Sequence, residues 1–429
     1  MSAVVIFGLL IGLILIGVPV CYCIAYSGIG FLLFTQMKPL ILIAQRTLNG
    51  MDSYTLLAIP LFTLAGYLMD KGGLSRRLVD FLEKACFWIP GGMGTITILC
   101  CAVFAALTGS GAATVAGIGA IMYPAMKNVG YRENTAAGIL ACGGALGPVI
   151  PPSICMIVYG TTMGVSVPAM FMGAVIPGLL MAFLLIVTNM IVCGRQKIRQ
   201  SRERYSIREI GKAFSHAWGV LLLPVVVLGG IYGGVFTATE AAAVCVMFAL
   251  ILGICYRELS IQNLLESLIK TVETSSMVII IVGMSAILSW ILSATGIPAQ
   301  IAAAVVPYIG NKYVYILVLL IILFLIGCLM ETVASMLILA PILVPIGLEL
   351  GMNDLHLALV FSLALVVGMV TPPFGLNLFA ACATTGQTFV QVVKGMIPFV
   401  IALVLSVIIV ALIPEISLVL PRAMGLIAG

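Results

Sequence analysis

Two apolar segments combine a glycine with a pair of prolines and could present backbone oxygens to a bound cation. GPVIPPS begins at Gly147, and GMVTPPF begins at Gly368. Proline has no backbone N–H, so Pro151 and Pro372 remove the donors that would bond the carbonyls of Gly147 and Gly368 in a helix. Such backbone is tolerated in a membrane only where it is buried in protein or lines a hydrated cavity. We therefore expect both segments to supply carbonyl ligands to Na⁺.

Short apolar segments in pairs, each with a small-residue turn, accompany the two proline breaks. The first pair spans about 94–126 and turns at TGS, and the second spans about 313–347 and turns near Gly327. Each segment is short for a membrane crossing, which predicts re-entrant hairpins. The expected sodium ligands are Thr108, Ser110, Gly147 and Ile150 in the first half, and Gly327, Gly368 and Thr371 in the second.

Hydroxyl and amide side chains near the hairpin turns and the breaks are the candidate substrate ligands. Opposed turns and breaks are expected to converge near the middle of the membrane, where helix N-termini and hydroxyls can hold an anion. The competing interpretation is that each hydroxyl bonds its local backbone. The candidates are Ser110, Ser153, Thr161, Thr162, Thr332, Asn377, Thr384 and Thr385.

Two carboxylates fall in apolar surroundings. Glu331 lies in the second hairpin, where an ionised carboxylate is costly, so it is a candidate coupling carboxylate that pairs with a proton or a cation. Glu240 follows Thr239 at the start of a helix, and we interpret this pair as an N-terminal cap.

The composition is that of an all-α polytopic membrane protein. The chain has 429 residues, of which 62% are hydrophobic and 8% charged, and its mean hydropathy is +1.27. Apolar runs of roughly 17 to 25 residues, each able to span the bilayer, recur along the chain. The first run lacks a basic n-region and an A-x-A site, so we expect a retained helix. The twelve cysteines and two histidines do not suggest a metal site.

Several motifs recur in the same order in the two halves of the chain. LTGSGAATVAG aligns with LIGCLMETVAS, ALGPVIPPS with VVGMVTPPF, and MDKGGLSRR with LSATGIPAQ. With five crossings in each half, the second half is inverted relative to the first. The predicted domains are a first repeat at 1–194 with a broken helix at about 135–165, a basic cytoplasmic linker at 195–214, and a second repeat at 215–429 with a broken helix at about 356–386.

The distribution of basic residues predicts the orientation. With the linker in the cytoplasm, most lysines and arginines lie on the cytoplasmic side, as the positive-inside rule requires. Both termini are then periplasmic. The net charge of +5 is spread over the ends of the spans and indicates no nucleic-acid partner. The basic residues expected outside are Lys38, Arg46, Lys312 and Arg422.

Three of these motifs together resemble a known family. GSGAATVAGIGAIMYPAM, GPVIPPSI and TPPFGLNLF, in this order, closely resemble the large, DctM-like membrane subunit of tripartite ATP-independent periplasmic (TRAP) transporters. The resemblance covers essentially the whole chain. It implies an elevator-type transporter related to the ion transporter superfamily, in which two inverted repeats form a moving domain of hairpins and broken helices. It also implies a scaffold with arms near 36–50 and 255–270.

The same resemblance implies partners, ions and cargo. The expected partners are a small four-helix membrane subunit, a periplasmic substrate-binding protein and membrane lipids of the bacterial inner membrane. The cargo would be an organic acid anion, such as a C4-dicarboxylate or sialic acid, driven by two or more Na⁺ ions. Carried over by motif, Pro152 joins the first sodium site. The first turn reads Thr-Gly-Ser where many relatives read Ser-Gly-Ser, which keeps the hydroxyl.

The alternatives to import are a stand-alone transporter or exchanger, an intramembrane enzyme and a passive channel. A stand-alone di- or tricarboxylate transporter or ion exchanger of the same architecture would need no binding protein. An intramembrane enzyme would need a catalytic constellation, and the apolar spans contain neither H-E-x-x-H nor a nucleophile near His or Lys. A passive channel fits the hairpins and the internal inversion less well than alternating access does. The chain also lacks the G-x-x-x-x-G-K-[ST] motif, so ion gradients must supply the energy.

Overall fold

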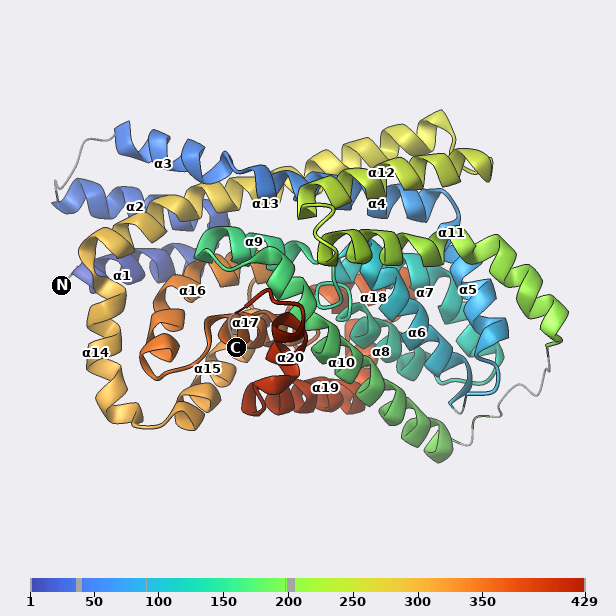
Figure 1. Ribbon diagram of the computed structural model, residues 1–429. Coiled ribbons are helices and arrows are strands. Elements are labelled where there is room, and N and C mark those ends of the chain that lie inside the picture. The colour runs from blue at the N-terminus through green and yellow to red at the C-terminus, as the bar shows by residue number, and fades with distance from the viewer. Residues whose placement is uncertain (1, 36–40, 90, 197, 199–204, 428–429) are drawn as a thin grey trace.

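The structure is a computed structural model, and every secondary-structure element in its described part is a helix (Figure 1). The all-α fold expected from the composition is thus confirmed. The described residues are 2–35, 41–89, 91–196, 198 and 205–427. The predicted external residue Lys38 and much of the predicted linker, residues 197 and 199–204, lie outside these ranges.

The helices of the first half agree closely with the segments expected from the sequence. Both members of the first predicted hairpin and both halves of the first predicted broken helix are present. In chain order the elements are α1 (Ser2–Leu15), α2 (Val20–Thr35), α3 (Ile41–Met51), the 3₁₀ helix η1 (Tyr54–Leu57), α4 (Ala58–Lys71), α5 (Leu74–Ala85), α6 (Gly92–Thr108), α7 (Gly111–Asn128), α8 (Glu133–Gly144), α9 (Ile154–Met163) and α10 (Val167–Gln196).

The second half contains the same succession of a hairpin, a broken helix and a long helix. The hairpin is α15–α16, the broken helix is α17–α18, and the long helix is α19. In order its elements are α11 (Ile207–Tyr232), α12 (Ala238–Cys255), α13 (Ile261–Thr295), α14 (Ile297–Ile309), α15 (Lys312–Gly327), α16 (Thr332–Glu349), α17 (Asp354–Gly368), α18 (Leu376–Thr385), α19 (Phe389–Leu412) and α20 (Glu415–Ala423).

Matching glycine corners precede the two hairpins. Gly73 has φ 70° before α5, and Gly296 has φ 64° before α14. These left-handed positions suit glycine, which carries no Cβ. They fall in the aligned motifs MDKGG and LSATG, so the sequence match reflects a shared local geometry. The domain boundaries and the inverted relation of the halves stay predictions.

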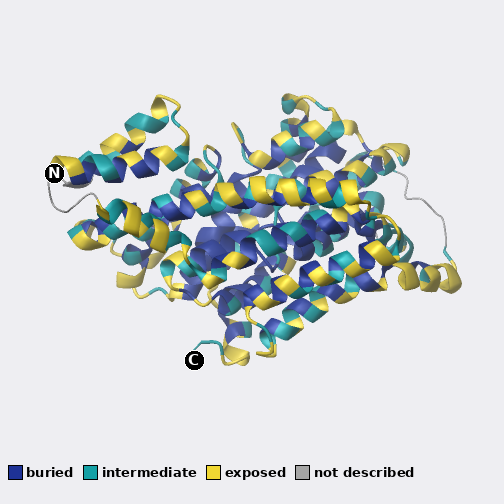
Figure 2. Cartoon of the chain, turned by 90° about the horizontal axis from the view of Figure 1, so that it is seen from above, coloured by how far each residue is buried: buried dark blue, intermediate teal, exposed yellow. Residues whose placement is uncertain are grey.

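Helices α1–α4 and α11–α13 form one layer, which we call the scaffold group. Helix α13 packs against α2, α3 and α4, and α12 packs against α4. The hairpins, the broken helices, α10 and α19 form the second layer, which we call the hairpin group (Figure 1). The buried residues concentrate in the centre of the molecule, and the outer helices carry the exposed positions (Figure 2).

The second predicted arm, at 255–270, is not a separate element. Helix α13 runs without interruption from Ile261 to Thr295, so its first turns take the place expected of the arm. The sequence from Ile261 to Val282 contains neither Gly nor Pro, so nothing ends the helix there. The first predicted arm corresponds to α3, and residues 36–40 lie outside the described part.

The basic linker is shorter than predicted. Helix α10 continues to Gln196, and α11 begins at Ile207, within the segment 195–214. Ser206 starts α11 early through a capping box, in which the Glu209 N–H donates to Ser206 Oγ at 3.3 Å and Glu209 Oε2 accepts from the Ser206 N–H at 2.7 Å. The last eight residues of the predicted linker are therefore helical.

The cap at Glu240 is confirmed with a different partner. The N-cap of α12 is Thr237, not Thr239, and Glu240 accepts the Thr237 N–H at 2.8 Å. The Thr239 hydroxyl donates instead to the Tyr54 carbonyl at 3.0 Å and ties α12 to η1. The reciprocal box needs a hydroxyl three residues before the glutamate, and Thr237 fulfils that spacing.

Six helices in the described part are long and apolar enough to cross a membrane. The pair α14–α15, bent by 118°, would make a seventh. Five of the six are expected crossings, whereas α16 belongs to the second predicted hairpin and is longer than expected for a re-entrant segment. The other expected crossings are shorter helices or broken helices, so helix length does not test the predicted five crossings per half. The six helices are α10, α11, α12, α13, α16 and α19.

Candidate functional site

The tip of the first hairpin lies directly on the first proline break. A Cβ built on Gly147 would lie 2.5 Å from the carbonyl oxygen of Ser110, so the two backbones are in contact. Gly109, with φ 60°, makes the turn between α6 and α7, and a Cβ there would lie 2.8 Å from the carbonyl oxygen of Pro152. The structure thus brings Ser110, Gly147 and Pro152 together, as the sequence predicts.

The first break leaves backbone oxygens available. Among the described residues, no hydrogen bond reaches the carbonyls of Gly147, Ile150 or Pro152. The Gly147 carbonyl lacks a donor because Pro151 has no N–H and the Ile150 N–H donates to Leu146 at 2.8 Å. The Ser110 hydroxyl also makes no hydrogen bond within the described part of the chain. Unpaired carbonyls in a membrane need a partner. A cation at the hairpin tip would provide one.

Thr108 is less available than predicted. Its hydroxyl is buried and bonds both the Phe104 carbonyl at 3.2 Å and the hydroxyl of Thr114 at 3.1 Å. The hydroxyl oxygen still has a lone pair to offer.

The tip of the second hairpin meets the second break through two glycines. A Cβ built on Gly368 would lie 2.5 Å from Cα and from the carbonyl carbon of Gly327. The Phe374 N–H donates to the Cys328 carbonyl at 3.2 Å, which joins the break to the tip by a backbone hydrogen bond. The predicted contact between Gly327 and Gly368 is therefore present.

The expectation that the Gly368 carbonyl is unpartnered is wrong. This carbonyl accepts the Thr371 N–H at 2.9 Å, because the chain tightens into a turn in which residue 371 replaces the missing proline donor. The Thr371 carbonyl accepts the Gly375 N–H at 3.3 Å, and the Thr371 hydroxyl donates to Val367. These oxygens each retain a lone pair for an ion. The second site thus presents fewer free oxygens than the first.

A cavity of about 110 Å³ lies between the second tip and the second break. Its walls include Gly327, Glu331, Met369 and Gly375. Water in the liquid occupies about 30 Å³ per molecule, so the cavity has room for a small ion with water. Glu331 is the N-cap of α16, where its Oε2 accepts the Ala334 N–H at 3.1 Å.

The donor set suits a hard monovalent cation. Within the described residues, no group of three or more His, Cys, Asp or Glu side chains could hold a metal ion. All twelve cysteines are free thiols. Transition metals prefer imidazole and thiolate ligands, whereas neutral carbonyl and hydroxyl oxygens suit Na⁺.

Most of the predicted substrate hydroxyls bond their local backbone. Ser153 donates to the Pro148 carbonyl and is the N-cap of α9, which corrects its assignment as a free substrate ligand. Helical threonines commonly donate to the carbonyl four residues earlier, because that acceptor lies within reach. Thr161, Thr162, Thr384 and Thr385 do so at 2.7, 2.7, 2.8 and 2.6 Å.

Two predicted candidates are buried without a complete set of partners. The Thr332 hydroxyl has no hydrogen bond in the described part of the chain. Asn377 donates to the Ala141 carbonyl at 3.4 Å, whereas its Oδ1 is unpaired among the described residues. A Cβ on Gly111 would lie 2.6 Å from that Oδ1. Asn377 thus joins the second break to the first hairpin. Ser335, one turn after Thr332, was not predicted from the sequence, and its hydroxyl is also buried without a partner in the described part of the chain.

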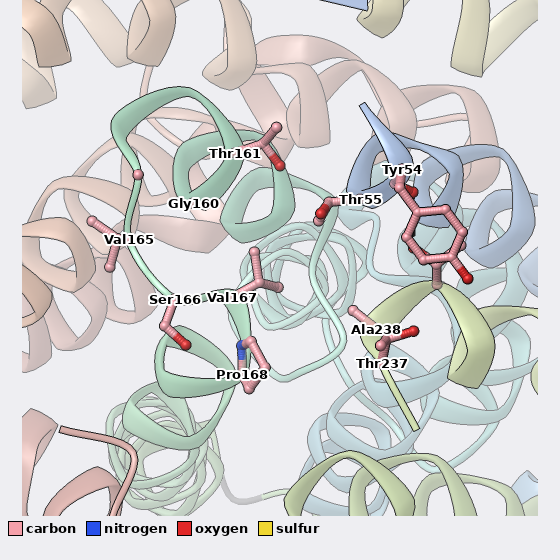
Figure 3. Close-up of a pocket in the computed structure, with 12 residues that line it drawn as sticks. Tyr54, Thr55, Gly160, Thr161, Val165, Ser166, Val167, Pro168, Thr237 and Ala238 are labelled. Atoms are coloured by element: carbon pink, nitrogen blue, oxygen red, sulfur yellow. Dashed lines mark hydrogen bonds between the residues drawn. The ribbon is translucent and has the colours of Figure 1, made fainter. Parts of the chain in front are cut away.

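Two cavities separate the scaffold group from the hairpin group. One, of about 480 Å³, lies between the end of α9, the start of α10, η1 and the start of α12 (Figure 3). The other, of about 410 Å³, lies between α3, α13 and the end of α9. Thr161 lines both cavities.

A comparison with known protein families identifies the family to which this chain belongs. Residues 7–416 match the family model described as the tripartite ATP-independent periplasmic transporter, DctM component. The chain belongs to this family. It is a large TRAP permease subunit, and because that family consists of membrane transport proteins, it is not an enzyme.

Relatives of the TRAP permease align over nearly its full length. The C4-dicarboxylate TRAP transporter large permease protein DctM of Pseudomonas aeruginosa is 38% identical over 386 residues, 90% of each chain. The 2,3-diketo-L-gulonate TRAP transporter large permease protein YiaN of Escherichia coli K12 is 32% identical over 422 residues, 98% of this chain and 99% of the relative. The resemblance inferred from the proline and hairpin motifs is confirmed.

A solved structure shares the fold of this TRAP permease. The YdaH transporter of Alcanivorax borkumensis, described as having an unusual topology, superimposes with a TM-score of 0.62 over 90% of this chain and 87% of that chain. The sequences are 13% identical, so the likeness concerns the fold alone.

Proposed function

We propose that this TRAP permease subunit imports an organic acid anion together with Na⁺ across the bacterial inner membrane. The observation that supports the proposal best is the backbone contact of each hairpin tip with its own proline break, at Ser110–Gly147 and at Gly327–Gly368. These contacts gather carbonyl oxygens at the places where the helices lack donors. The two proposed sites, one at each hairpin tip, would together bind at least two coupled Na⁺ ions.

Coupled ions can drive concentrative uptake. Each Na⁺ that moves inward across about 100 mV contributes roughly 2.3 kcal/mol. Movement of the hairpin group against the scaffold group, as in an elevator, would carry ions and cargo together. The large cavities between the two groups suit a moving interface. Glu331, which lines the cavity of about 110 Å³ between the second hairpin tip and the second break, is the proposed coupling carboxylate.

The cargo and partners follow from the family. The two relatives are named as transporters of C4-dicarboxylate and of 2,3-diketo-L-gulonate, so we propose an organic acid of this class here. Delivery would require a periplasmic binding protein. A small four-helix membrane subunit would brace the scaffold group, and lipids would cover its remaining exposed apolar face. Both termini of this chain would be periplasmic.

Uptake by reconstituted protein tests the proposal. The chain and its small membrane subunit are reconstituted into liposomes, the binding protein is added outside, and uptake of labelled succinate, sialic acid and 2,3-diketo-L-gulonate is measured with and without an inward sodium gradient. We expect accumulation of one acid that requires both the gradient and the binding protein. Equal uptake without a sodium gradient would refute the coupling, and uptake without the binding protein would favour the stand-alone exchanger.

Removing the free hydroxyl of the first site should weaken sodium binding. For Ser110→Ala we expect a two- to tenfold rise in the Na⁺ concentration for half-maximal uptake, since one neutral oxygen ligand is worth about 0.5–1.5 kcal/mol. Thr371→Ala should act in the same direction at the second site. The matched control is Ser215→Ala, which removes an exposed hydroxyl on α11 that bonds Lys212. An unchanged sodium requirement in both site variants would remove Ser110 and Thr371 from the set of ligands.

A further inference from the structure

The cavity between α3, α13 and the end of α9 contains a single charged side chain among its lining residues, Arg46. Its volume of about 410 Å³ falls within the range of about 300–1,000 Å³ that is usual for small-molecule sites. The described part of the chain offers Arg46 no carboxylate within ion-pair distance, so its charge is balanced by no acidic side chain there. The cavity is therefore electropositive.

Close packing of α3 on α13 sets the backbone position of Arg46, whose side chain is exposed. A Cβ on Gly50 would lie 2.5 Å from the Cβ of Ala286, and a Cβ on Gly283 would lie 2.7 Å from the Met51 side chain, so the two helices approach closely. One turn before Gly50, the Arg46 guanidinium lies over the ring of Trp290 at 5.3 Å from its centroid. The cation–π contact holds the guanidinium beside the cavity and leaves its N–H groups free to donate.

Hydroxyl and amide side chains line the same cavity as Arg46. Ser285, Ser289 and Ser293 lie four residues apart, so they share one face of α13. Ser285 and Ser293 donate to their own helix at 2.7 and 2.9 Å. The side chains of Ser289 and Asn49 make no hydrogen bond within the described residues and are free to donate.

The opposite wall belongs to the hairpin group. Thr161 and Thr162, at the end of α9, complete the cavity. Helix α9 begins directly after the first proline break, and this cavity lies at its opposite end, about 15 Å away along the helix. Both the scaffold and the hairpin group line the cavity, and any relative movement of the two groups would therefore take it apart.

We propose that Arg46, with Asn49 and Ser289, forms an anion site on the scaffold that holds a carboxylate of the cargo while α9 lies opposite. The inference rests on the proposed function and adds a cargo contact outside the hairpins and breaks. The same chemistry would accept a lipid phosphate, because guanidinium donors bind both oxyanions. Arg46 is a residue expected on the periplasmic side, where cargo arrives.

Uptake kinetics give the first test, with the acid that the wild-type proteoliposomes accumulate out of succinate, sialic acid and 2,3-diketo-L-gulonate. For Arg46→Gln we expect the KM for uptake to rise about tenfold with an unchanged sodium requirement, and for Arg46→Lys a smaller rise. The matched control, Arg76→Gln, removes an exposed arginine of α5 far from this cavity and should leave KM unchanged. An unchanged KM in Arg46→Gln would overturn the proposal.

Lipid composition distinguishes the two sources of the anion. The measurements are repeated in liposomes of phosphatidylcholine alone and in liposomes that also contain phosphatidylglycerol. A cargo contact predicts the same rise of KM in both. A rise confined to the liposomes with phosphatidylglycerol would assign the site to a lipid phosphate and overturn the cargo contact.

Tryptophan fluorescence provides a test that needs neither transport nor the binding protein. The chain has three tryptophans, so replacing Trp88 and Trp218 by Phe leaves Trp290 as the reporter in this chain. The complex in nanodiscs is titrated with the same three acids. We expect a saturable change in emission with one of them that Arg46→Gln abolishes. No response to any acid, or the same response in Arg46→Gln, would refute the site, whereas loss of sodium dependence alone would refute the coupling and leave the site standing.

Discussion

Uptake by Gly368→Ala is expected to fall about 10- to 100-fold, although the complex still assembles. The new Cβ would lie 2.5 Å from backbone atoms of Gly327, and backbone, unlike a flexible side chain, cannot move aside at low cost. Overpacking of this kind typically costs about 1–3 kcal/mol, which here would separate the second hairpin from its break. The measurement is sodium-driven uptake in proteoliposomes, with assembly checked by size-exclusion chromatography.

Gly147→Ala should behave in the same way at the first site. Its Cβ would lie 2.5 Å from the Ser110 carbonyl oxygen, which is itself beside the proposed ion. Gly229→Ala in α11 is the matched control, since a Cβ there has no neighbour within 4 Å and alanine favours the helix. Near-normal uptake in both Gly147→Ala and Gly368→Ala would show that the tip-to-break contacts do not build the ion sites.

The second large effect concerns stability rather than ion binding. Gly395→Ala in α19 should destabilise the complex by about 2–4 kcal/mol and lower its thermal midpoint by several degrees. A Cβ on Gly395 would overlap the backbone carbonyl of Asn134, at the start of α8. The contact is reciprocal, since a Cβ on Gly138 of α8 would lie 2.5 Å from the backbone of Gly395 and Met396 in α19. The two helices cross backbone against backbone, so neither glycine has a neighbour that can yield.

The stability prediction is checked by thermal unfolding of the purified complex in nanodiscs. The matched control is Gly194→Ala at the end of α10, which would place its Cβ in open space. If Gly395→Ala melts at the same temperature as the control, the close crossing of α8 and α19 does not limit stability.

Local features of the chain could be predicted because they depend on neighbouring residues. The hairpins and breaks were recognisable from short apolar segments, the TGS turn and the Pro-Pro pairs, since proline removes donors and glycine permits left-handed turns wherever they occur. The cap at Glu240 followed from the same kind of local rule, with the hydroxyl two residues earlier than expected. These signals, in their order, were also sufficient to indicate the family.

The sequence could not decide which polar groups remain free, because that depends on what the fold brings near them. The Gly368 carbonyl is bonded by Thr371 within a tightened turn, whereas the Gly147 carbonyl has no donor among the described residues. Asn377, just after the second break, donates to the Ala141 carbonyl of α8, 236 residues away in the chain, and its Oδ1 lies against Gly111 of the first hairpin. From the sequence, Arg46 was expected only to lie on the periplasmic side of the membrane. In the structure, α13 provides its aromatic neighbour Trp290 and the serines that line the same cavity. Interactions between neighbouring residues determined the helices, turns and breaks. Tertiary packing decided which polar groups are bonded, because a contact between distant segments cannot be recognised from the sequence of either segment alone.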